Sequence, residues 1–142
     1  MTILTLPAPA KLNLFLHVLN QRENGYHNIQ TVFQLIDFQD HLSFQLQPHP
    51  EIRMITHHLG LPEADNLVVK TAKKLQTLTQ CQLGCDIALD KHIPMGAGLG
   101  GGSSDAATTL LALNKLWQLN LSVEDLAIIG AQIGADVPVF VH

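Results

Sequence analysis

The first half of the chain alternates apolar and polar residues in the way that half-buried strands do. Turn-forming residues divide this pattern into short runs, and one more run follows later in the chain. The PAPA stretch that begins at Pro7 is interpreted as a break between the first two strands, and the run at 51–56 as the hairpin partner of the run before it. The pattern predicts strands at 2–6, 11–19, 28–36, 42–47, 51–56 and 85–89.

The second half carries apolar residues at helical spacing. A first stripe lies within 66–79, and a second begins near Ser103 and continues to Trp117. Ser122 and Asp125 have the spacing of a capping box, which predicts the start of a third helix, and Gly134 is expected to end it. The run DVPVFV after Gly134 is interpreted as the beginning of another strand.

Strands that come mostly first, followed by helices, indicate one α+β domain over residues 1–142. We expect a mainly antiparallel sheet with helices packed on one face. A chain of this length buries enough surface to fold without disulfides.

Composition narrows the function classes. The chain is 46% hydrophobic and 14% charged, with a net charge of -4, which is typical of a globular protein. It lacks the basic face that nucleic-acid binding needs, an apolar run long enough to span a membrane, and the basic opening of a signal peptide. We therefore expect a cytoplasmic protein with neither a nucleic-acid nor a membrane partner. Cys81 and Cys85 match no zinc or redox motif and are expected to be reduced thiols.

A glycine-rich stretch, PMGAGLGGGSSDAA, stands directly before the second helical stripe. Glycine lets a backbone approach a ligand without a side chain in the way. The first N–H groups of a helix lack partners within the helix, and the helix dipole adds partial positive charge, so this end attracts anions. We predict a phosphate-binding loop formed by Pro94, Met95, Gly96, Ala97, Gly98, Leu99, Gly100, Gly101, Gly102, Ser103 and Ser104.

Three common phosphate-binding loops do not fit this stretch. The G-x-G-x-x-G match at 96–101 lacks the acidic residue that ends the second strand of a dinucleotide-binding fold. A Walker A loop needs a lysine where Ser103 follows Gly102, and the H-R-D and D-F-G motifs of protein kinases are missing. A flexible surface loop is the remaining alternative, but a run of glycines ahead of a serine-capped helix favours phosphate binding.

The glycine stretch resembles the second motif of the GHMP small-molecule kinases. Three further stretches extend the resemblance: PAKLNLFLHV from Pro9, GYHNIQTVFQLIDFQD from Gly25, and GADVPVF from Gly134. Together they cover the chain from about Leu6 to Val141. The resemblance implies the N-terminal, ATP-binding domain of that family, with a fold like domain 2 of ribosomal protein S5. Members are about twice this length, so their second α+β domain is absent from this chain.

The resemblance also implies a reaction. The γ-phosphoryl group of ATP, with Mg²⁺, would pass to the 2-hydroxyl of a cytidine diphosphate methylerythritol, a substrate of the non-mevalonate isoprenoid pathway. Asp136 matches the catalytic base and Lys11 the catalytic lysine that would hold this base ionised. Substrate contacts are implied for Asn13, for Tyr26 stacked on the cytosine and for His27, which would hydrogen-bond it. Asn66 and Lys91 match nucleotide-side positions, and no Mg²⁺ ligand is assigned.

Two alternatives remain from the sequence. One is a non-catalytic half-kinase that only binds a nucleotide; a Lys11 and Asp136 pair favours an enzyme instead. The other is a GHMP kinase for a sugar, mevalonate or homoserine, which the GYHNIQTVFQ stretch disfavours. The histidines outside these motifs, His41 and His92 among them, show no ligand spacing and are expected to be surface residues rather than metal ligands.

Overall fold

The computed structural model describes residues 2–21, 27–56, 62–93 and 101–142, and for residues 11–21, 27–38 and 62–66 it describes the backbone alone. Strands precede most of the helices, as the sequence predicts. In chain order the elements are β1 (Ile3–Gln21), β2 (His27–Gln47), β3 (Ile52–Met54), α1 (Pro62–Thr79), β4 (Gly84–Asp90), α2 (Gly101–Leu116), α3 (Val123–Ile133) and α4 (Val137–Val141).

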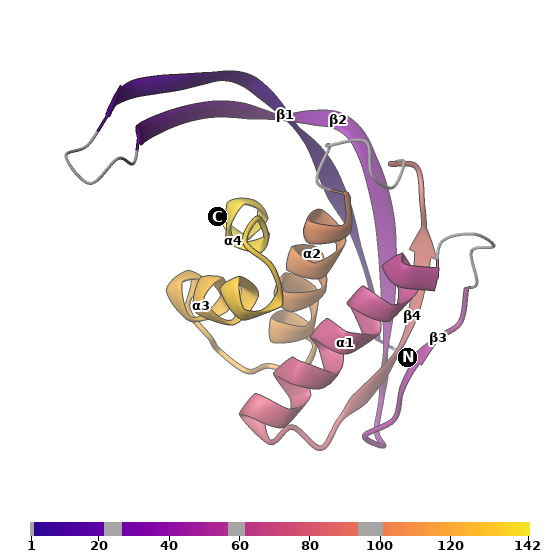
Figure 1. Cartoon of the computed structure of the whole chain (residues 1–142). Helices are drawn as coiled ribbons and strands as arrows, with labels where there is room; N and C mark the ends of the chain where they lie inside the picture. The colour runs from indigo at the N-terminus through magenta and orange to yellow at the C-terminus, as the bar shows by residue number, and fades with distance from the viewer. Residues whose placement is uncertain (1, 22–26, 57–61, 94–100) are drawn as a thin grey trace.

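One curved sheet with the strand order β1-β2-β4-β3 lies along one side of the helices (Figure 1). β2 pairs antiparallel with both β1 and β4, and β3 pairs parallel with β4. The expectation of a mainly antiparallel α+β sheet is therefore confirmed. The predicted hairpin of 51–56 with the preceding strand is wrong, because β4 lies between β2 and β3. The almost continuous burial of β4 suits a central strand, while the three residues of β3 suit an edge.

β1 runs without a break through the proline-rich stretch, contrary to the sequence prediction. The Leu46 N–H donates to the Thr2 carbonyl, and the register beyond it faces Pro7 with His41 and Pro9 with Gln39. In this alternation the residues at 7 and 9 would direct their N–H groups away from β2. Because β1 is an edge strand among the described residues, proline at these positions removes no ladder hydrogen bond.

The helices lie on one face of the curved sheet, as expected (Figure 1). α2 packs against β1 and β2, α1 packs against α2 and β3, and α3 and α4 pack against α2. Apolar residues from the sheet and α2 make up most of the core, with Phe44, Ile87, Leu110 and Leu113 fully buried. No helix in the described ranges is both long enough and apolar enough to cross a bilayer.

One helix prediction and one strand prediction need correction, and the predicted start of a third helix is confirmed. α1 begins at Pro62, four residues before the predicted start, because proline is well suited to a first helical turn. The segment at 137–141 is the short helix α4 instead of a strand: its proline again lies in the first turn, and residues 137, 140 and 141 are buried at helical spacing. The capping box of Ser122 and Asp125 is present at the start of α3.

Candidate functional site

The first turn of α2 holds the described part of the predicted phosphate loop. Gly101, Gly102, Ser103 and Ser104 form this turn, and it contains no acidic residue. Its leading N–H groups have no acceptor within the helix, so this end of α2 carries the partial positive charge that an anion needs. The rest of the predicted loop lies outside the described residues: Pro94, Met95, Gly96, Ala97, Gly98, Leu99 and Gly100.

A buried ionic cluster lies beside this turn and consists of Asp40, Lys91 and Asp105, called here the Asp40 cluster. The Lys91 Nζ is 2.7 Å from the Asp40 Oδ2 and 3.2 Å from the Asp105 Oδ2. All three side chains are at most 3% exposed. The cluster thereby connects β2, the residue that follows β4, and α2.

Asp40 also fixes the backbone that leads into the glycine stretch. Its Oδ1 accepts hydrogen bonds from the N–H groups of His92, at 2.6 Å, and Ile93, at 2.8 Å. These are the last described residues before the stretch that begins at Pro94. One buried carboxylate thus anchors the strand side of the glycine stretch, while Asp105 anchors its helix side.

The two carboxyl groups have opposite pKa shifts. Burial raises the pKa of Asp105 to about 8, and the nearby Asp40 carboxylate adds to this effect. The pKa of Asp40 is lowered: burial alone would raise it, but the hydrogen bonds from Asp105, Lys91 and the two backbone N–H groups together stabilise its ionised form more. At neutral pH the cluster therefore holds one cation, one anion and one neutral acid, so its net charge is zero.

We predict a distinct pH dependence for an Asp105→Asn variant. The folded wild-type chain keeps a proton on Asp105 that the unfolded chain releases above about pH 4, so folding stability contributed by this group falls from that pH to about pH 8. Asparagine cannot titrate but retains a hydrogen-bond donor, so the variant should lose less stability between pH 5 and pH 8. Asp40 does not interfere, because its lowered pKa acts at lower pH.

Urea unfolding at pH 5, 6.5 and 8 measures this difference. Glu124→Gln removes an exposed carboxylate from α3 and should follow the wild type at every pH. Parallel profiles for wild type and Asp105→Asn would show that Asp105 has no raised pKa.

Two buried oxygens at this end of α2 have no hydrogen-bond partner among the described residues: the Ser104 Oγ and the Asp105 Oδ1. Buried polar atoms are nearly always paired in folded proteins. The Asp105 oxygen belongs to the neutral acid of the cluster, for which a missing bond costs less than for a charged group. The Ser104 hydroxyl lies in the first turn of α2, where it is available for a hydrogen bond to a ligand.

Gly101 packs so closely that any larger residue would force its neighbours to move. A Cβ added there would lie 2.9 Å from both the Lys91 Nζ and the Ile93 Cγ2, closer than real Cβ contacts come. At Gly102 the nearest such contact is the Leu67 Cδ2 at 3.5 Å, an ordinary distance. Glycine at 101 thus lets the start of α2 lie directly against the Asp40 cluster.

Asp136, the predicted base, lies at the N-terminus of α4, which packs beside α2 (Figure 1). It is exposed, and its side chain does not cap this helix. α4 is held in place by Val137, Phe140 and Val141, which are buried. Asp136 therefore lies at the surface, at the start of a helix that is packed on the core.

Three of the remaining predicted site residues, Lys11, Asn13 and His27, lie on β1 and β2, and Asn66 lies on α1. In the backbone register Lys11 faces Leu35 and Asn13 faces Phe33. His27 begins β2, six residues from Phe33, which is about 20 Å along an extended strand. Tyr26 lies outside the described residues. Asn66 is inside α1 and not at its start, so it does not cap that helix.

Asp40 and Asp105 are the two site residues that the sequence analysis missed. Asp40 had a usable signal, since it is in phase with Leu42 and Phe44 on the inward face of β2. A charged residue at a core position indicates a partner or a function. Asp105 stands directly before the buried Ala106 and gives the same kind of signal in a helix.

Comparisons with known proteins show which chains this one is similar to. The model of the N-terminal domain of GHMP kinases matches residues 66–142. A protein from Pseudoalteromonas atlantica named 4-diphosphocytidyl-2-C-methyl-D-erythritol kinase is 58% identical over 95% of this chain and 47% of its own length. The chain thus spans about half the length of the curated relatives that it matches.

Solved structures show the same relationship. The crystal structure of a 4-(cytidine 5'-diphospho)-2C-methyl-D-erythritol kinase has a TM-score of 0.77 at 38% identity, covering 96% of this chain and 48% of that one. A homoserine kinase from Cytophaga hutchinsonii has a TM-score of 0.68 at 19% identity, covering 92% and 40%. The second likeness is one of fold alone.

Proposed function

Since the chain belongs to the GHMP kinases, we propose that it forms the ATP-binding half of an enzyme that phosphorylates 4-(cytidine 5'-diphospho)-2-C-methyl-D-erythritol on its 2-hydroxyl. The observation that carries the proposal is the 58% identity, over nearly all of the chain, to a protein with that kinase name. Such an enzyme serves non-mevalonate isoprenoid synthesis, and a cytoplasmic location is part of the proposal.

The start of α2 fits the phosphates of ATP. The turn at 101–104 offers backbone N–H groups, no acidic side chain and a buried Ser104 hydroxyl that lacks a described partner. Glycine at 101 lets this turn lie directly against Lys91 and Ile93. These features support phosphate binding by residues 94–104, with hydroxyl contacts from Ser103 and Ser104.

Lys91 and Asn66 complete the proposed nucleotide side. Lys91 is buried and paired with two carboxyl groups. This supports a role in positioning the phosphate loop from the core side. Mg²⁺ would neutralise charge on the β- and γ-phosphate oxygens. Asp105 is the carboxyl group nearest in sequence to the serines, but it is buried against Lys91. We therefore assign no protein ligand for Mg²⁺.

The chemistry is assigned to Lys11 and Asp136. The substrate hydroxyl oxygen attacks the γ-phosphorus, the bond from that phosphorus to the β,γ-bridging oxygen breaks, and ADP leaves. Asp136 accepts the hydroxyl proton, and Lys11 orients the hydroxyl and offsets charge on the phosphoryl oxygens. The exposed position of Asp136 at the start of α4 supports this role, because a base must be within reach of the substrate hydroxyl.

The cytidine end of the substrate is assigned to the β1–β2 hairpin. Tyr26 would stack on the cytosine ring and His27 would hydrogen-bond it, while Asn13 would contact the methylerythritol end. The separation of Asn13 and His27 along the hairpin supports this division, because the substrate is itself extended.

We predict that Gly101→Ala weakens ATP binding at least about tenfold, whereas Gly102→Ala changes it little. The added methyl group at 101 would push against the Lys91 ammonium and Ile93 and displace the start of α2, while a methyl group at 102 makes an ordinary contact. A hydrogen bond to a charged group contributes about 1.5–3 kcal/mol, so the loss of one from the phosphates costs about tenfold or more in affinity. Calorimetry with ATP and Mg²⁺ measures the affinities, and circular dichroism verifies that both variants fold.

Equal ATP affinities in the two glycine variants would contradict the loop assignment.

The non-catalytic alternative is tested by adding the part of a relative that this chain does not span. Joining this chain to the second half of the Pseudoalteromonas atlantica relative gives a protein called here the extended chain. Phosphate transfer by the extended chain supports an enzyme, and ATP binding without any transfer supports a binding module.

A further inference from the structure

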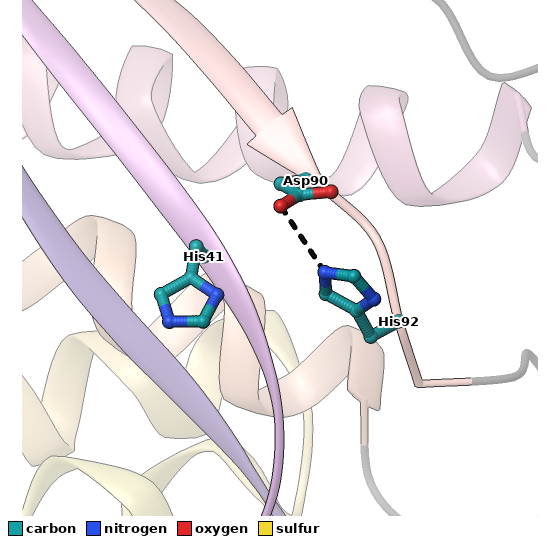
Figure 2. A group of neighbouring side chains, drawn as sticks. All are labelled: His41, Asp90 and His92. Carbon is teal, nitrogen blue, oxygen red and sulfur yellow. Dashed lines mark ion pairs between the residues drawn. The ribbon is translucent and has the colours of Figure 1, made fainter.

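Three potential metal ligands gather on the outer face of the sheet, opposite the Asp40 cluster. They are His41 on β2, Asp90 at the end of β4 and His92 two residues later (Figure 2). Each offers one ligand atom, and these atoms all lie within 4.8 Å of one another. We propose that His41, Asp90 and His92 form a binding site for a zinc-like divalent cation, distinct from the Mg²⁺ that accompanies ATP.

Strand register brings these residues together. His41 and Asp90 are direct partners in the antiparallel pair of β2 and β4. Asp90 and His92 are two residues apart, so an extended backbone directs both side chains to the same face. Asp40 and Lys91, their immediate neighbours, point to the opposite face and into the core. The alternation leaves the three ligands on the solvent side, where an ion can reach them.

The geometry is close to what zinc requires. The His92 Nε2 lies 3.1 Å from the Asp90 Oδ2, the ion pair drawn in Figure 2. Zinc bonds of about 2.1 Å at tetrahedral angles place ligand atoms about 3.4 Å apart. The side chains of His92 and Asp90 are 50% and 69% exposed, so they are free to close the remaining gap toward His41. A water molecule would occupy the fourth position.

The contact between the Gln39 amide and the His41 ring also suits a metal-binding histidine. Its Nε2 lies 3.2 Å from the His41 Nε2, and the other ring nitrogen is on the side of Asp90 and His92 in Figure 2. Histidines that bind metals commonly use one ring nitrogen for the ion and donate the other N–H to a neighbour. If the Gln39 amide group is rotated by 180°, its oxygen takes the place of its nitrogen and accepts a hydrogen bond from the His41 Nε2–H.

The ligand types decide which cation binds. Two imidazoles and one carboxylate suit zinc and the neighbouring first-row divalent ions, whereas Mg²⁺ prefers oxygen ligands alone. Thiols would compete for zinc, but burial raises the pKa of Cys85 to about 12 and keeps it protonated. Cys81 is partly exposed, and a Cys81→Ser background removes it from the measurement.

Calorimetry with ZnCl₂ on the 142-residue Cys81→Ser chain tests the proposal. We expect His41→Ala and His92→Ala each to weaken the tightest zinc binding at least about tenfold, since loss of an outer-shell partner alone costs 10- to 100-fold. His49→Ala removes an exposed histidine from the turn after β2 and should change nothing. MgCl₂ in large excess should not displace zinc.

A thermal melt supplies a second readout. Zinc should raise the Tm of the starting chain and of His49→Ala, because a ligand that binds the folded state stabilises it. It should leave the Tm of the other two variants unchanged. The proposal is overturned if the starting chain binds no zinc, if His41→Ala and His92→Ala retain its affinity, or if His49→Ala loses as much as they do.

Discussion

Replacing Asp136 with asparagine should lower the kcat of the extended chain by about 10²- to 10⁴-fold. Asparagine keeps the shape of the side chain but cannot accept the hydroxyl proton, and single acid–base groups contribute rate factors of this size. The folding of α4 should not change, because it depends on its buried apolar residues. Steady-state transfer of phosphate from ATP to the cytidine diphosphate methylerythritol substrate measures the effect.

The control for this variant is Glu124→Gln, which also removes one exposed carboxylate from the C-terminal helices. It should retain full activity. Lys11→Ala should lose activity as Asp136→Asn does, and the double variant should be little worse than the poorer single variant, since residues that act as a unit are not additive. Full activity in Asp136→Asn would remove the base from the mechanism.

Replacing Lys91 with methionine should destabilise the folded chain by about 3–5 kcal/mol. The substitution leaves the Asp40 carboxylate buried without its cation, and breaking a buried ion pair on one side has a cost in this range. Methionine nearly conserves the volume, so the loss is electrostatic. Lys115→Met removes an exposed lysine from the last turn of α2 and should change stability by less than about 0.5 kcal/mol.

A compensating variant sharpens this test. Adding Asp40→Asn to Lys91→Met removes the unpaired charge, and the amide oxygen still accepts hydrogen bonds from the N–H groups of His92 and Ile93. The double variant should therefore recover part of the lost stability in urea unfolding. If Lys91→Met matched Lys115→Met, the Asp40 cluster would contribute nothing measurable to the fold.

Local patterns in the sequence were sufficient for most of the elements. Alternation and helical spacing predicted which segments are strands and the first three helices, and the capping box located the start of α3. The separate strands predicted at 28–36 and 42–47 are one strand, β2. They failed where a proline acts differently at an edge strand or in a first helical turn. The prolines at 7 and 9 do not interrupt β1, and Pro138 lies in the first turn of α4.

The site was only partly predictable, because its geometry depends on pairing between distant strands. The glycine stretch indicated phosphate binding by local chemistry alone. The partners of Lys91 come from β2 and α2, and no local spacing in the sequence indicates that Asp40 and Asp105 meet there. The same holds for His41, which meets Asp90 and His92 only through the register of β2 with β4.

The most direct test of the central claim is phosphate transfer from γ-labelled ATP by the 142-residue chain and the extended chain in parallel. The extended chain should phosphorylate the cytidine diphosphate methylerythritol substrate and leave mevalonate and homoserine unlabelled. The 142-residue chain should bind ATP and transfer little or no phosphate, because half of the walls that hold the substrate are missing. A folded, ATP-binding extended chain that labels mevalonate or homoserine in place of the cytidine substrate, or labels none of the three, would contradict the account.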